Sequence, residues 1–285
     1  MKKALLLLLA GLPALIGCSA TRIAYDNFGL MSRFMLGRYV DLDTAQAEAL
    51  KPRIAGFHQW HRTNELPVYA AVMHSASQRA AQGITAEDVQ WAIASVRAHL
   101  RSFAARASEE AAPVLVTLDP VQLAALEHKF AEDSEKYARE YLAVDDAKRR
   151  RAQLKRAIGR FSEFAGDLTH EQEERIEQFL LAHERHVVLR FEDRQRWQRD
   201  ALALLREHRE PRELGRRLAE TFTRPELRRS EEFVREDKRW EQDFAQLVVE
   251  LDRSMSARQR ASVVKRLQDY AEDASVLAGR QREAA

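Results

Sequence analysis

The chain has 285 residues, with 46 Lys or Arg, 44 Asp or Glu and one cysteine. Because the two charges nearly balance, the composition gives no evidence of the basic face that nucleic-acid binding needs, so no nucleic-acid partner is expected. One cysteine excludes a framework of internal disulfide bonds.

The first 17 residues have the features of an export signal. Lys2 and Lys3 precede an apolar stretch, Ala4–Ile16, which is shorter than the roughly 20 residues that span a bilayer. The stretch ends in Leu15-Ile16-Gly17-Cys18, which matches the lipobox, where lipoprotein signal peptidase cuts before a lipid-modified cysteine. We therefore predict that residues 1–17 are a signal peptide and that Cys18 carries the acyl chains, palmitate among them, that bind the protein to a membrane.

The residue after the cysteine bears on the choice of membrane. Ser19 stands where lipoproteins retained in the inner membrane commonly have Asp. The sequence therefore favours a protein anchored to the outer membrane and facing the periplasm, with the inner membrane as the less favoured site.

Residues 18–42 are unusually apolar for an exposed tether. We interpret them as a lipidated tether with a first helix that docks on the body, and the alternative is a segment lying in the membrane interface. The apolar and aromatic residues are Ile23, Tyr25, Phe28, Leu30, Met31, Phe34, Met35, Leu36 and Tyr39.

Residues 43–285 are predicted to form an all-α, elongated bundle of long amphipathic helices. A helix-start pattern recurs, in which a capping Asp, Ser or Thr is followed three positions later by Gln or Asp. Its five occurrences begin at Asp43, Thr85, Asp119, Thr169 and Ser256. Their unequal spacing favours a bundle with similar helix starts over a repeat protein.

Apolar residues keep helical spacing behind each cap, as a packed bundle requires. The longest helix is predicted from Thr169 to about Arg209, and the charged stretch 206–237 is expected to project into solvent or pack loosely. The body is either one bundle or two contiguous subdomains that meet near residues 144–168.

The densest cluster of chemically versatile side chains lies at residues 58–69. We interpret it as a candidate interaction site, although packing in the core explains the same residues. The site comprises Trp60, His61, Arg62, Glu65, Pro67 and Tyr69. The alternative is a metal-dependent or hydrolytic enzyme that uses His58, His61 and Glu65, because histidines three apart share a helix face.

A second histidine pair, His183 and His186, lacks the four-residue spacing of the zinc-protease motif. No phosphate-binding glycine loop or serine-nucleophile motif is found. We therefore expect no catalytic residues, metal or cofactor, and a non-enzymatic protein.

Three segments resemble an uncharacterised lipoprotein family of Gram-negative bacteria, known only as a domain of unknown function. They are residues 21–27, residues 39–43 and residues 60–69. The resemblance implies an envelope lipoprotein without an established activity. In addition, Leu168-Thr169-His170-Glu171-Gln172 is similar to the Leu-Thr-x-x-Gln motif of the periplasmic stress chaperones Spy and CpxP, which are small helical cradles. The expected function is a binding or chaperone-like module with a protein partner in the envelope.

Overall fold

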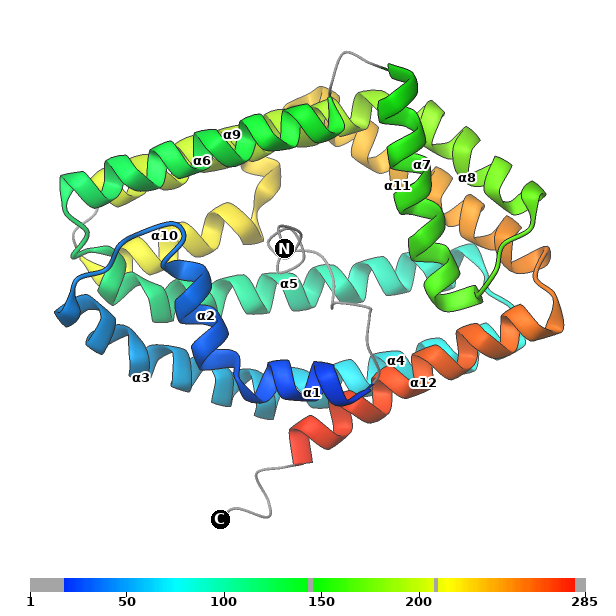
Figure 1. Cartoon of the computed structure of the whole chain (residues 1–285), viewed down its shortest axis with the longest axis horizontal. Helices are drawn as coiled ribbons and strands as arrows, with labels where there is room; N and C mark the ends of the chain where they lie inside the picture. The colour runs from blue at the N-terminus through cyan, green and yellow to red at the C-terminus, as the bar shows by residue number, and fades with distance from the viewer. Residues whose placement is uncertain (1–17, 143–145, 208–209, 280–285) are drawn as a thin grey trace.

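A computed structural model describes residues 18–142, 146–207 and 210–279 of the chain (Figure 1). All regular structure in these ranges is helical, which confirms the predicted fold class. None of the helices within them is both long enough and apolar enough to cross a membrane. The predicted signal peptide, residues 1–17, lies outside the described residues.

The helices follow one another with short connections. In chain order they are α1 (Cys18–Asp26), α2 (Phe28–Leu36), α3 (Thr44–Trp60), the π-helical turn η1 (His61–Glu65), α4 (Leu66–Gln82), α5 (Ala86–Leu115), α6 (Pro120–Tyr141), α7 (Asp146–Ala165), α8 (His170–Ala182), α9 (Glu184–Glu207), α10 (Pro211–Thr223), the short 3₁₀ turn η2 (Pro225–Leu227), α11 (Glu231–Arg253) and α12 (Ala257–Gly279).

All five predicted helix starts are confirmed as reciprocal caps. In each, the side chain of the capping residue accepts a hydrogen bond from the backbone N–H three positions later, and the side chain there accepts one from the backbone N–H of the cap. These bonds satisfy amide groups that a helix N-terminus would otherwise leave without partners.

Most of the helices belong to two similar sets, and the last helix of each set packs against the other set. The first set has an interrupted long helix (α3, η1 and α4), then α5 and α6; the second has α8 and α9, then α11 and α12, with α10 and η2 inserted. Helix α6 packs along α9, and α12 packs along α4. Figure 1 shows these two pairs on opposite sides of an oval frame that α5 crosses. The two sets are therefore packed together through α6 and α12.

Two pairs of caps meet in the interior. The side chains of Gln46 and Gln122 hydrogen-bond to each other, and each Nε2 also donates to a backbone carbonyl just before the partner's cap, at Thr117 and Asp41 respectively. In the second set, Gln172 and Gln259 bond to each other in the same way. Each pair therefore locks the N-termini of two helices together, α3 with α6 and α8 with α12.

Helices before and after residues 144–168 share extensive contacts, notably α4 with α12 and α6 with α9. The largest buried cluster also crosses this stretch, because Leu123 and Leu126 on α6 pack with Leu202 and Leu205 on α9. A division into two subdomains at residues 144–168 stays a prediction.

Two details of the sequence-based prediction are wrong. The long helix expected from Thr169 to about Arg209 is broken at His183, where the backbone leaves the helical region (φ −119°, ψ 23°). The stretch 206–237 contains α10, which packs closely along α5 and buries Leu214 and Leu218 in the largest core cluster. Its charged residues lie on the outer face of α10, where Glu213 pairs with Arg216 and Arg217.

Candidate functional site

The candidate site centres on η1, the turn at which the first long helix changes register. Pro67, at the start of α4, has no N–H to donate to the carbonyl of Thr63, and in a regular α-helix its ring would clash with that carbonyl. The wider π-helical turn over His61–Glu65 accommodates this defect. It carries Glu65 into the interior and His61 to a partly buried position, whereas Pro67 itself is exposed.

Glu65 is the buried acid of the site. Its side chain, in a residue only 5% exposed, accepts a hydrogen bond from Ser102 Oγ (2.6 Å) and lies 2.8 Å from Nδ1 of His99. Both partners are on α5, so Glu65 ties the π-helical turn to that helix. The ring of His99 in turn contacts Tyr69 edge-on, with the ring centres 4.9 Å apart. Burial, reinforced by the nearby charge of Glu65, raises the pKa of Tyr69.

His61 contacts the N-terminal segment. Its Nδ1 lies 2.9 Å from Oη of Tyr25 on α1, at hydrogen-bond distance. Burial lowers the pKa of His61 to about 4 and raises that of Tyr25 to about 12, so both groups are neutral near pH 7. A neutral imidazole and a neutral hydroxyl form a hydrogen bond without the cost of burying a charge.

Further contacts fix α1 and α2 on the body. Phe28 on α2 stacks on His58, whose pKa is lowered by burial and by the charge of Arg62. Arg62 lies over the ring of Tyr25 and 3.4 Å from a carboxylate oxygen of Asp26. The cluster at residues 58–69 is thus largely occupied by the chain's own tether.

The predicted site residues therefore separate into groups. His61, Glu65 and Tyr69 come together in the interior, Arg62 contacts α1, Trp60 packs its ring against Phe57 on the same helix, and Pro67 is exposed. Sequence reasoning missed Tyr25, His99 and Ser102 as partners of the site. Tyr25 stood out as an aromatic tether residue, but no local pattern indicated which part of the chain it contacts.

The second histidine pair occupies the corresponding break in the other long helix. His183 and His186 are buried where α8 meets α9, and both face α11. His186 Nε2 lies 3.0 Å from Oδ1 of Asp237, and its ring stacks on Trp240. The ring of His183 contacts Phe179. Both long helices thus have a His-x-x-His sequence at their break, where a buried histidine contacts an acid or a hydroxyl on another helix.

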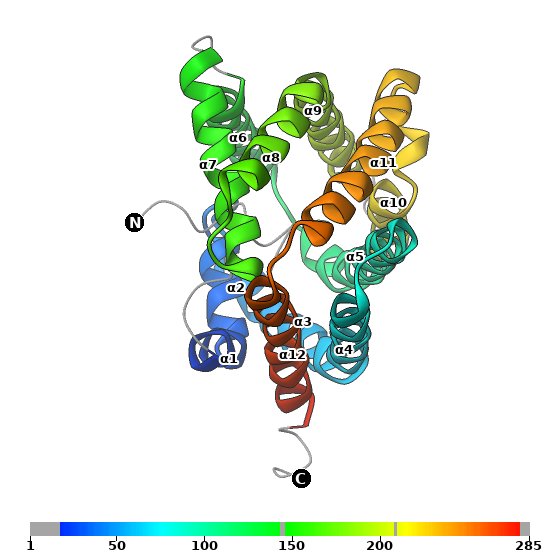
Figure 2. The same cartoon turned by 90° about the vertical axis from the view of Figure 1, so that its right-hand side faces the viewer.

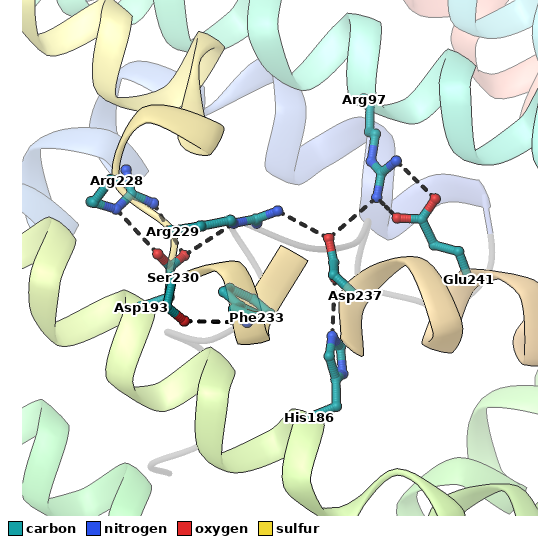
Figure 3. Close-up of polar contacts among 9 residues, drawn as sticks. All are labelled: Arg97, His186, Asp193, Arg228, Arg229, Ser230, Phe233, Asp237 and Glu241. Atoms are coloured by element: carbon teal, nitrogen blue, oxygen red, sulfur yellow. Dashed lines mark hydrogen bonds and ion pairs between the residues drawn. The ribbon is translucent and has the colours of Figure 1, made fainter. Parts of the chain in front are cut away.

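An ion-pair network joins this region to α5 (Figure 3). Arg229 lies between two acids, 3.5 Å from Asp193 and 2.9 Å from Asp237, and Arg97 on α5 pairs with Asp237 and Glu241. Burial raises the pKa of Asp237, but the hydrogen bond from His186 and the arginine charges outweigh that effect and hold it below its usual value. The network connects α5, α9 and α11.

The side chains suggested for an enzyme are engaged in contacts within the fold. His58 lies against Phe28 and Arg62, His61 against Tyr25, and Glu65 against α5. Within the described ranges, no group of three or more His, Cys, Asp or Glu residues is arranged to hold a metal ion.

Comparison with known proteins identifies a family for the chain. A family model described as a family of unknown function, DUF6279, matches residues 38–235. The chain belongs to this family. Of the segments that carried the resemblance, residues 39–43 and 60–69 lie within the match and residues 21–27 precede it. No curated protein and no solved structure matches the chain.

Proposed function

We propose that this member of DUF6279 is a lipoprotein of the bacterial envelope, anchored through Cys18 to the outer membrane on its periplasmic face. Its helical body acts as a non-enzymatic module that binds another envelope protein. The observation that carries the proposal is the position of Cys18, which is the cysteine of a lipobox and lies in a helix that is docked on the body.

The docking of α1 supports this role for Cys18. A lipoprotein is usually tethered to its acyl chains by a polar, flexible linker, whereas here Cys18 lies in α1. That helix is held on the body by Tyr25 and by Arg22, whose Nε donates to Asp273 on α12 (2.9 Å). The Arg22–Asp273 pair is mostly shielded from solvent. Acyl chains on Cys18 would therefore hold the body close to the membrane and in a restricted orientation.

A binding role for the body is supported by an exposed apolar strip on α5. Val96 and Leu100 are one helical turn apart and are 53% and 46% exposed, although their spacing places them in the apolar stripe of this helix. Val89, earlier in the same stripe, is buried. Adjacent exposed aliphatic side chains on a rigid helix are a common feature of protein-binding surfaces.

The proposal of a chaperone-like activity has less structural support. Its motif, Leu168–Gln172, forms the cap of α8, and Gln172 is 1% exposed and bonded to Gln259. These contacts give the motif a structural role at a helix junction. Helix capping alone therefore explains the motif, and client binding is a separate proposal.

Site-specific cross-linking in cells tests the binding role. A photoreactive amino acid at Val96 should give one cross-linked envelope protein, identified by mass spectrometry, and the same substitution at Val121, a 77% exposed residue on α6, serves as the matched control. The Val96 product should disappear when Leu100 is changed to Ser. Identical products from the two positions, or none from Val96, would contradict a binding surface on α5.

The chaperone proposal has its own assay. The purified lipoprotein should slow the aggregation of a chemically unfolded model client at near-equimolar ratio. Aggregation at the same rate with and without the protein would exclude this activity and leave the binding role to be judged by cross-linking.

A further inference from the structure

Helices α1 and α2 have a second apolar face, which no residue in the described ranges covers. Their inner face contacts the body through Tyr25, which packs near Leu66, and Phe28, which packs near Leu50 and Ile54. The outer residues are among the most exposed large hydrophobic side chains described: Ile23 (62%), Leu30 (63%), Met31 (47%) and Phe34 (71%).

Leu30 and Phe34 lie on one side of α2, because they are four residues apart, and Met31 lies beside Leu30. Ile23 is exposed on α1, before the bend at which α2 leaves the direction of α1 (Figure 1). We call these four exposed residues the apolar stripe. The break between α1 and α2 is a single residue, Asn27, whose backbone N–H still donates to the carbonyl of Ile23. A helix docked on a protein normally turns polar residues outward, so a helix that is apolar on both sides is covered on both sides.

We propose that the outer face of α1 and α2 lies in the surface of the lipid bilayer. The proposal rests on the proposed anchoring through Cys18. Cys18 lies in α1, and at 1.5 Å per residue Phe34 lies roughly 24 Å from it, measured along the two helices. Acyl chains on Cys18 would bring the bilayer to one end of the stripe, and helices lying along the surface would bring it to the whole stripe.

Charge favours a membrane as the occupant. Arg33 and Arg38 are exposed at the edge of the stripe, whereas Asp26, the acid of α1, lies within ion-pair distance of Arg62. An apolar stripe flanked by arginines is the pattern of helices that lie in the interface of anionic membranes. The π-helical turn fits this arrangement, because His61 and Arg62 hold the inner face while the outer face contacts lipid.

Fluorescence from a single introduced thiol tests the proposal. Because Cys18, the only natural cysteine, is consumed by lipid in the mature protein, Phe34→Cys supplies one free thiol for an environment-sensitive dye. The matched control is Leu227→Cys, an equally exposed leucine (75%) in η2, which joins α10 to α11 on the side of the molecule opposite α1 and α2 (Figure 2). The lipidated proteins are reconstituted into vesicles of phosphatidylethanolamine and phosphatidylglycerol, with or without lipids that carry a quenching doxyl group.

Doxyl lipids should quench the dye at position 34 at least about twofold and leave the dye at position 227 nearly unchanged, because interfacial helices bury their apolar face at the level of the acyl boundary. Changing Leu30 and Met31 to Ser should reduce the quenching at position 34. A dye at position 34 that is unquenched in vesicle-bound protein would overturn the proposal. A blue shift without quenching would also overturn it, because the face would then contact protein, such as a second copy.

The two proposals fail in different ways. Protein without acyl mass on Cys18 that stays in the supernatant of sedimented vesicles would contradict the anchoring itself. Lipidated protein that sediments with vesicles but shows no quenching at position 34 would contradict only the contact of α1 and α2 with lipid.

Discussion

The paired caps predict a large effect for a substitution remote from any candidate site. Gln122→Ala removes four hydrogen bonds: the one its Oε1 accepts from the backbone N–H of Asp119, the one its Nε2 donates to the carbonyl of Asp41, and the two exchanged with Gln46. At about 1 kcal/mol each, the free energy of unfolding should fall by about 4 kcal/mol. That is a large part of the roughly 5–15 kcal/mol typical of a folded protein.

The measurement is chemical denaturation of the detergent-solubilised protein, followed by far-ultraviolet circular dichroism. Gln90→Ala, an exposed glutamine on α5, is the control and should change the free energy of unfolding by less than about 0.5 kcal/mol. A double-mutant cycle of Gln46→Ala with Gln122→Ala should give a coupling energy of about 1–2 kcal/mol. A loss at Gln122 no larger than that at Gln90, or additive single effects, would refute the role of the paired caps.

Two further predictions follow from close packing and from burial. Gly215 on α10 would place a Cβ 3.3 Å from Ala112 Cβ and 3.4 Å from the carbonyl oxygen of Ser108, so Gly215→Val should destabilise the protein by about 1–3 kcal/mol in the same titration. Gly159→Val on α7, where a Cβ meets open space, should not destabilise it, and equal losses at both glycines would contradict close packing of α10 on α5. The folded-state pKa of His61 lies near 4, below its ordinary value of 6.5, so as the pH falls the histidine takes up a proton in the unfolded chain before it does so in the folded protein. The free energy of unfolding should therefore be retained above about pH 6.5 and should fall as the pH drops toward 4. His61→Phe should lessen this fall in acid denaturation curves, and an unchanged pH dependence in the variant would show that His61 does not titrate as a buried group.

Local signals in the sequence were sufficient to predict the five helix starts that have reciprocal caps. The five caps are formed by side chains and backbone groups within three residues of each other, so their hydrogen bonds depend little on the rest of the fold. The pairing of Gln46 with Gln122 could not be predicted from the sequence, because it joins residues 76 positions apart. Capping explained each glutamine alone, and nothing local indicated that two caps meet.

The errors have a similar origin. The break at His183 lies within a continuous helical pattern, and no glycine or proline marks it. The histidine at the break is buried against α8 and α11. The many charges near α10 outnumber Leu214 and Leu218, so the sequence did not indicate that these two leucines pack in the largest core cluster. At the candidate site, the cluster at residues 58–69 was recognised, but its partners Tyr25 and His99 depend on the tertiary fold.

Labelling with radioactive palmitate tests the central proposal most directly. The thiol of Cys18 is the only one in the chain, and the hydroxyl of a serine is a poor acceptor for the diacylglyceryl group. Cells producing the wild-type protein should incorporate the label into a band of mature size. Cys18→Ser should show no label and should accumulate uncleaved precursor. Wild-type protein without label, or a labelled Cys18→Ser variant, would contradict the assignment of the chain as a lipoprotein.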